Sequence, residues 1–207
     1  PEGTDRMSVT SPTCAWDLTT PPVLEPLTVT EAKAQIRSVQ DQEDAVVSSY
    51  IKAARAAAEA HLGRGLLTQT WTLAISDFVT SIPLPFAAPL QSVTSVKYYD
   101  EAGVQQTLAT TIYTVDTRSR PGRIALAADQ TWPAVQSDRR VNRIEIAYVV
   151  GWTSRETVPE DIKQGMRVLI GMMDADRDGM EAGAEQALRV AKTFWTDRVF
   201  WTPPEYG

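Results

Sequence analysis

The sequence predicts an α+β protein in which a helical core of about three helices is interrupted by a small antiparallel β-sandwich or barrel-like insertion. Three observations support this class. Apolar residues recur at helical spacing in 27–66, alternate at strand spacing in 67–152, and return to helical spacing in 153–178. An extended N-terminal arm (1–26) and a C-terminal docking tail (179–207) are expected to flank these three parts.

The first helical part contains two segments separated by a short break. Thr28 and Glu31 have the S/T-x-x-E spacing of a capping box, which predicts a helix start. A longer helix is predicted from Asp41 to Leu62, with acidic residues in its first turn and Gly63 just past its end. Its middle is rich in alanine, which allows close approach of another helix, from the same chain or from another copy, at Ala54, Ala57 and Ala58.

The middle of the chain predicts short strands joined by tight turns. Trp71, Leu73 and Ile75 alternate with smaller residues, which is typical of a half-buried strand. The turn 100–103 ends in glycine between two strand-like runs and predicts a hairpin. Residues 82–85 hold two prolines, which favours a sheet edge. Six or seven such strands predict a small sandwich or barrel.

Both ends of the chain carry large apolar residues that need a surface to cover them. Trp16 and Leu18 lie in the proline-rich arm, where they either fold back onto their own domain or dock on a neighbouring subunit. Near the other end, Phe194, Trp195, Phe200 and Trp201 lie within eight residues. These aromatic residues either pack within the chain or form a docking tail for a partner.

Composition excludes several classes of function. The formal net charge of the 207 residues is -6, which argues against a chain that grips nucleic acid through clustered cations. Cys14 is the only cysteine, so neither an intrachain disulfide nor a multi-cysteine zinc site is expected. No apolar run is long enough to span a bilayer, and the first residues do not resemble a signal peptide. We therefore expect no membrane contact and a cytoplasmic site of synthesis.

Catalytic motifs are weak. His61, the only histidine, lies at the end of the alanine-rich helix with no nucleophile or acid indicated beside it, so we expect a structural role. The spacing of Asp174, Asp176, Asp178 and Glu185 matches the EF-hand template, with Gly179 at its sixth position, but Glu181 replaces the usual apolar residue. A solvated loop is the favoured interpretation and a calcium site the alternative. No enzyme and no cofactor are expected.

Six segments resemble the head–tail connector (adaptor) proteins of tailed bacteriophages. They occur in the order LTVTEAKAQIR, DQEDAVVSSYIKAARAAAEAHLGR, LLTQTWTL, PLQSVTSVKYYDEAGVQQTL, PGRIAL and VPEDIKQGMRVLIG. The resemblance covers residues 26–178. It is to the longer branch of the family, in which a β-rich insertion interrupts a helical core and which includes prophage and gene transfer agent versions.

The resemblance implies a structural role in the neck of a phage or phage-like particle made in the bacterial host cytoplasm. Such adaptors form a ring of twelve copies under the portal protein, extend the DNA channel and receive the next neck or tail protein, such as a stopper. Double-stranded DNA would pass through the channel without sequence-specific binding, which suits an acidic chain. The residues expected to insert into the portal are Phe194, Trp195, Arg198, Phe200 and Trp201. Contacts between neighbouring copies are expected at Trp16, Leu18, Ala54, Ala57 and Ala58.

Two other classes of function stay open at this point. A carbohydrate- or protein-binding module would be a monomer with an exposed aromatic platform on its sheet, formed by Tyr98, Tyr99 and Trp132. A small hydrolase or metal-dependent enzyme would need a clustered acid site, which the sequence does not indicate.

Overall fold

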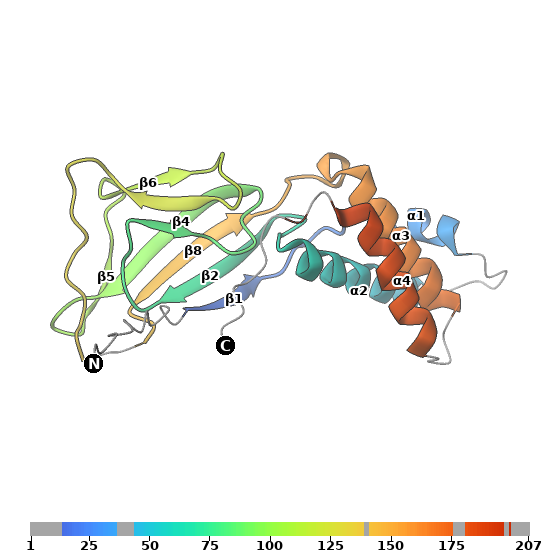
Figure 1. Cartoon of the computed structure of the whole chain (residues 1–207), viewed down its shortest axis with the longest axis horizontal. Helices are drawn as coiled ribbons and strands as arrows, with labels where there is room; N and C mark the ends of the chain where they lie inside the picture. Colours follow the sequence, from blue (N-terminus) through green and yellow to red (C-terminus); the bar gives the residue numbers. More distant parts are fainter. Residues whose placement is uncertain (1–13, 37–43, 139–140, 176–180, 197–198, 200–207) are drawn as a thin grey trace, which may run out of the picture.

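The computed structural model describes residues 14–36, 44–138, 141–175, 181–196 and 199, with the backbone alone for 181–184. In these ranges the molecule is elongated, with the strands at one end and the helices at the other (Figure 1). The chain passes from helices into strands and back into helices. The predicted α+β class is confirmed.

The helical part contains four α-helices and one 3-10 helix among the described residues. They are α1 (Val29–Gln35), α2 (Asp44–Leu62), η1 (Arg155–Thr157), α3 (Glu160–Ala175) and α4 (Glu181–Trp195). Helices α1, α2 and α3 pack against one another, while α4 packs on α3. α4 adds a fourth helix to the about three that we expected, and it lies within the segment 179–207 that we expected to be a docking tail; docking of that segment on a partner stays a prediction.

The core of the helical part draws on all four α-helices. It contains buried residues at helical spacing, among them Val47, Ile51, Ala54, Ala58, Leu62, Ile162, Met166, Leu169 and Ile170. From α4 it receives Ala187, Ala191 and Trp195, which are four residues apart and therefore lie on one face. This face holds α4 against α3.

The β part consists of two antiparallel sheets. The larger has the order β1-β2-β8-β4-β5 and the smaller the order β3-β7-β6. Their strands are β1 (Cys14–Thr20), β2 (Gln69–Ile75), β3 (Ser81–Pro83), β4 (Leu90–Tyr99), β5 (Gln105–Thr107), β6 (Tyr113–Asp116), β7 (Arg123–Leu126) and β8 (Ile144–Val150). As predicted from its prolines, β3 lies at a sheet edge.

The two sheets share one apolar core. In the central strand β8, Ile144, Ile146 and Tyr148 are fully buried, as their alternation predicts. Further buried side chains come from the strands of both sheets: Leu73, Ile75, Ile82, Val96 and Ile124. The hydroxyl of Tyr148 donates a hydrogen bond to the carbonyl of Pro85 at 2.9 Å. That bond satisfies the one polar atom that this side chain brings into the core.

Two motifs that depend on neighbouring residues form as predicted. Thr28 caps α1: its hydroxyl accepts from the N–H of Glu31, and the Glu31 carboxylate accepts from the N–H of Thr28. At the hairpin between β4 and β5, the Asp100 carboxylate accepts from the N–H groups of Ala102 and Val104. Each motif is closed by atoms a few residues apart, so the surrounding fold is not needed to specify it.

Part of the expected N-terminal arm forms a β-strand. Cys14–Thr20, expected within it, form the edge strand β1, which pairs antiparallel with β2 in the register Trp16 to Leu73. The strand runs toward the helical part (Figure 1). Residues 1–13 lie outside the described residues.

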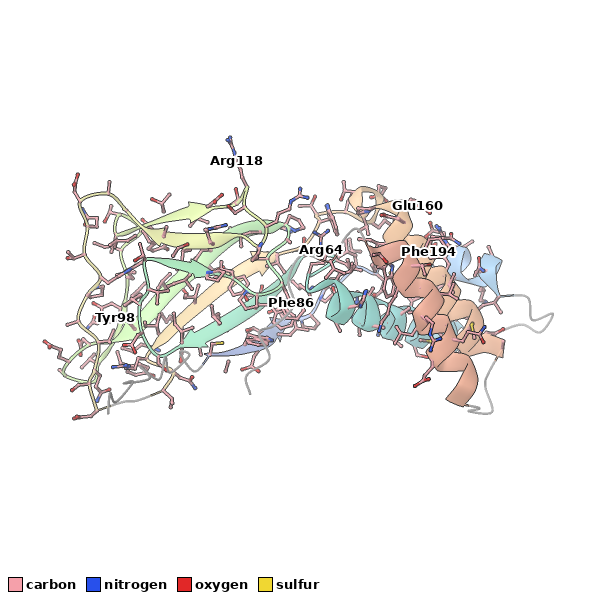
Figure 2. The ribbon with its side chains drawn as sticks, viewed as in Figure 1. Arg64, Phe86, Tyr98, Arg118, Glu160 and Phe194 are labelled. Carbon is pink, nitrogen blue, oxygen red and sulfur yellow. The ribbon has the colours of Figure 1, made fainter. Side chains whose placement is uncertain are left out.

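The two parts of the molecule are joined by paired backbone segments. The segment after α2 and the segment after β8 pair in a parallel bridge between Leu67 and Trp152. Gly151 adopts φ +94°, and a Cβ atom there would lie 2.2 Å from the Leu67 carbonyl oxygen. The Arg64 guanidinium lies 5.3 Å from the centre of the Trp152 ring, within the range of a cation–π contact. Figure 2 shows Arg64 and Phe86 in this junction.

Candidate assembly surfaces

Phe194 and Trp195 are neighbours in the last turn of α4, but one is exposed and the other is buried. Phe194 is 39% exposed on the outer face of the helix, whereas Trp195 is fully buried (Figure 2). The indole N–H of Trp195 donates to the Ile162 carbonyl at 3.2 Å, and the ring lies against Gly165, where a Cβ atom would be 2.3 Å from the indole nitrogen. Trp195 was expected to insert into a portal. In this structure it serves the chain's own core, because α3 offers it a glycine-lined slot and a hydrogen-bond acceptor.

The other residues expected to contact a portal cannot be placed. Arg198, Phe200 and Trp201 lie outside the described residues. Val199, which is described, is half-buried against the helical core. A role for these three residues in partner binding therefore stays a proposal.

The alanine stripe of α2 also faces inward. Ala54 and Ala58 are fully buried in the helical core, and Ala57 packs at its margin. We expected Ala54 and Ala58 to lie between copies; in this structure their small side chains bring the chain's own helices together. In the arm, Trp16 is half-buried against the sheet core, while Leu18 is 40% exposed.

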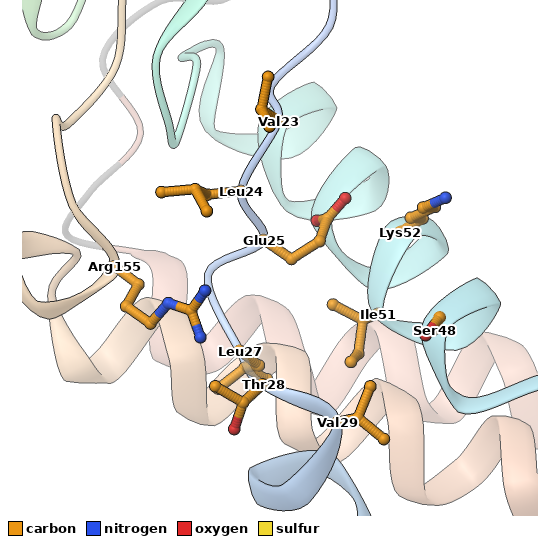
Figure 3. A pocket seen from close by; sticks show the side chains of 10 residues that line it. All are labelled: Val23, Leu24, Glu25, Leu27, Thr28, Val29, Ser48, Ile51, Lys52 and Arg155. Carbon is orange, nitrogen blue, oxygen red and sulfur yellow. The ribbon is translucent and has the colours of Figure 1, made fainter. Parts of the chain in front are cut away.

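An open groove runs between the segment that follows β1 and the middle of α2 (Figure 3). It has a volume of about 350 Å³ and is lined by Val23, Leu24, Glu25, Leu27, Thr28, Val29, Ser48, Ile51, Lys52 and Arg155. Val23 is 95% exposed at its edge and Leu24 is 45% exposed. Sequence reasoning missed this groove; the only signal was an apolar pair between prolines, in PPVLEP.

A polar network lies beside the groove, where α2 meets the sheet. The guanidinium of Arg55 donates to Glu25 and to Glu59, each at 2.8 Å. The second carboxylate oxygen of Glu59 accepts from the Leu66 N–H and from the Gln69 amide, again at 2.8 Å. Burial raises the pKa of Glu59, against the opposing effect of these donors. The network connects α2 to Glu25 on the segment between β1 and α1, to Leu66 on the segment after α2, and to Gln69 on β2.

Among the described residues, the candidate catalytic and metal residues form no cluster of ligands. His61 is half-buried, its ring centre 5.7 Å from that of Trp195, and burial together with nearby Lys192 lowers its pKa. A neutral, packed imidazole fits the expected structural role. Among the described residues no group of three or more potential metal ligands occurs.

The EF-hand alternative fits the helices poorly. Asp174 lies within α3 and is almost buried, and Glu185 lies within α4. Only residues 176–180 separate the two helices, whereas the calcium loop needs twelve residues. Asp176 and Asp178 lie outside the described residues.

The aromatic residues of the sheet do not form an exposed platform. Trp132 stacks on Phe78 with ring centres 4.5 Å apart, and Tyr98 meets the same Phe78 ring edge-on at 6.2 Å. Tyr98, Tyr99 and Trp132 are all half-buried. Stacking on Phe78 occupies one face of the Trp132 ring.

Among solved structures, this fold is similar to chains of gene transfer agent particles. No family model matches the sequence, and no curated protein matches it. The fold is similar to a chain in the virion of a native gene transfer agent particle, with a TM-score of 0.69, 24% identity, and 93% of this chain and 98% of that chain covered. The four-helix part and the two-sheet part are thus covered together.

Two further solved structures give the same result. A chain in the neck of an empty gene transfer agent particle, computed with C6 symmetry, matches with a TM-score of 0.67, 24% identity, and 86% and 94% coverage of this chain and that chain. A chain in the neck of a native particle, computed with C12 symmetry, matches with a TM-score of 0.61, 23% identity, and 84% and 94% coverage. Among the described residues, no helix is long and apolar enough to cross a membrane.

Proposed function

We propose that this chain is a structural head–tail adaptor in the neck of a phage or phage-like particle. Copies of it form a ring under the portal protein, extend the DNA channel and provide the surface on which the next neck or tail protein, such as a stopper, assembles. The chain acts by binding and shape, with no catalytic step.

The observation that carries this proposal is the extent of the structural likeness. Chains in gene transfer agent necks match this fold across both its β part and its helical part, and cover at least 84% of it. One of these necks was computed with C12 symmetry, which agrees with a ring of twelve copies. A likeness of the insertion alone would leave a small recognition module as an equal candidate.

The charge of the chain supports the proposal independently. DNA that must move through a ring is retarded by dense phosphate contacts, because each cation that neutralises a phosphate adds to affinity. A chain with 26 acidic and 20 basic residues presents few such contacts. We therefore propose that DNA passes this ring without sequence-specific binding.

The burial of Trp195 changes which residues we propose for the portal contact. Trp195 anchors the last turn of α4 on α3, close in sequence to the residues proposed for the portal contact. We propose that Phe194, Arg198, Phe200 and Trp201 make the portal contact, with Trp195 as its internal support. A truncation that includes Trp195 would damage the fold together with the contact.

The experiment compares the full chain with a variant that lacks residues 200–207 and keeps Trp195. Light scattering measures the mass of each protein alone and after mixing with portal rings from the same particle. We expect the full chain to form a ring of about a dozen copies, alone or on the portal. The truncated chain should keep its circular dichroism spectrum and lose portal binding.

Two outcomes would count against parts of this proposal. Portal binding that is unchanged by the truncation would remove the C-terminal contact and leave the adaptor role standing. A full chain that stays monomeric and ignores the portal would overturn the adaptor role and favour a binding module. A Phe194→Ala variant, which changes one exposed ring, tests whether the helix end itself takes part.

A further inference from the structure

The groove beside α2 has the properties of an unfilled contact surface. Val23 is 95% exposed and Leu24 is 45% exposed, and both lie at the edge of a hollow that also reaches Leu27 and Ile51. Figure 3 shows Leu24, on the segment between β1 and α1, directed away from α2. Adjacent exposed apolar side chains next to a hollow are typical of a site that another polypeptide covers.

The charged residues around the groove restrict what can cover it. Lys52 and Arg155 line it, and neither forms an ion pair with a carboxylate of the described residues. The one acidic residue of the lining, Glu25, is already paired with Arg55 at 2.8 Å. An occupant that combines carboxylates with small apolar side chains would satisfy both features.

We propose that this groove receives residues 1–13 from a neighbouring copy of the chain. This inference rests on the proposed ring, and it names the contact that joins one copy to the next. The segment PEGTDRMSVTSPT carries two carboxylates, on Glu2 and Asp5, one cation, on Arg6, and two apolar side chains, on Met7 and Val9, so its acidic side chains outnumber the basic one. Its composition therefore complements the two cations and the apolar wall of the groove.

The placement of β1 favours a neighbouring copy over the same chain. β1 runs from Cys14 toward the helical part, so residue 13 joins the strand at the end away from the groove (Figure 1). To fill its own groove, the segment would have to retrace the seven-residue strand, using roughly 23 Å of its roughly 43 Å reach. In a ring, each copy can instead receive the segment from the next, as head-to-tail interfaces require.

Disulfide trapping between full-length chains tests the contact. Every chain carries Cys14→Ser. Chains with Met7→Cys are mixed with chains that carry Val23→Cys, alone at high concentration and in rings assembled on the portal. Val104→Cys is the matched control, because Val104 is also an exposed valine but lies on the β part. We expect the Met7–Val23 pair to form disulfide-linked dimers about tenfold faster than the Met7–Val104 pair.

Charge exchange tests the chemistry without depending on ring assembly. A labelled peptide of residues 1–13 is titrated into the full chain and into the variant Lys52→Glu, Arg155→Glu. We expect the variant to bind at least tenfold more weakly. A peptide with Glu2→Lys and Asp5→Lys should recover most of that loss on the variant and bind the unaltered chain poorly.

The outcomes separate this inference from the proposed function. If the chain binds the portal but trapping at Val23 is no faster than at Val104, the groove contact is wrong and the adaptor role stands. If the chain ignores the portal, the adaptor role fails, and the peptide titration still decides whether the groove takes this segment. Tighter binding of a peptide of residues 199–207 would overturn the N-terminal segment as the occupant. Trapping only within one chain carrying both cysteines would overturn exchange between copies.

Discussion

The side-chain amide of Gln69 donates a hydrogen bond to the buried carboxylate of Glu59 at 2.8 Å. Glu59 lies near the end of α2 and Gln69 begins β2, so this contact joins the helical part to the sheet. The same carboxylate also accepts from Arg55 and from the Leu66 N–H. The Glu59 carboxylate therefore helps to fix the angle between the helical part and the sheet.

Removing the Glu59 carboxylate should destabilise the whole chain. Glu59→Ala leaves the Arg55 guanidinium, the Gln69 amide and the Leu66 N–H without their shared acceptor in a buried site. Loss of one partner from a buried polar network costs about 3 kcal/mol. We expect the free energy of unfolding, measured by urea denaturation, to fall by about that amount. A loss under about 0.5 kcal/mol would show that water replaces the carboxylate.

The stability difference between the unaltered chain and Glu59→Gln should depend on pH. Burial raises the pKa of Glu59 in the folded state, so folding favours its protonated form. The contribution of Glu59 to stability is therefore fully present below its pKa in the unfolded chain and is lost as pH rises through the raised pKa. Because glutamine does not titrate, the unaltered chain should lose stability relative to Glu59→Gln over that range. Parallel unfolding curves at all pH values would contradict the raised pKa.

Replacing Trp195 should damage the fold, whereas replacing its neighbour Phe194 should not. Trp195→Ala removes a fully buried indole and its hydrogen bond to Ile162, and changes of this kind cost about 3–5 kcal/mol. Phe194→Ala removes a partly exposed ring and should change the free energy of unfolding by less than about 1 kcal/mol. Thermal unfolding followed by circular dichroism distinguishes the two. Similar small effects for both would return Trp195 to the group of partner-binding candidates.

The sequence predicted those elements whose signals are local. The capping box at Thr28 and the hairpin turn at Asp100 are closed by hydrogen bonds within a few residues. In β8 every second residue is buried, on one face of the strand. In α3 the buried residues recur at helical spacing and form a stripe along the helix. Such patterns depend little on the rest of the chain.

The elements that sequence reasoning missed depend on distant partners. β1 has only Trp16 and Leu18 as an alternating signal, and it becomes a strand because β2 pairs with it. α4 buries Ala187, Ala191 and Trp195, whose spacing of four was the available signal; the density of aromatic residues pointed to a docking tail instead. An alanine stripe or an aromatic cluster shows that a surface is needed, but not whether that surface belongs to the same chain.

The polar network and the groove could not be derived from the sequence. Arg55 and Glu59 have the i,i+4 spacing of an ordinary surface pair. Glu59 is nevertheless buried, where it contacts Leu66 on the segment after α2 and Gln69 on β2. The groove joins the segment between β1 and α1, α2 and η1, and Lys52 on α2 is about a hundred residues from Arg155 on η1 along the chain. Only the packing of the helical part brings Lys52 and Arg155 to the same hollow.

The capping box of α1 gives a prediction with its own pH dependence. Thr28→Ala removes the hydroxyl that accepts from the Glu31 N–H, and the loss of such a cap costs about 1 kcal/mol. Hydrogen bonds from the backbone and side chain of Thr28 lower the pKa of Glu31 in the folded state. The Glu31 contribution is therefore present above its unfolded pKa and is lost as pH falls through the lowered pKa. We expect urea denaturation to show a stability gap between the unaltered chain and Thr28→Ala that is widest near neutral pH and narrows in acid. A gap that does not change with pH would mean that the hydroxyl and the Glu31 carboxylate act independently.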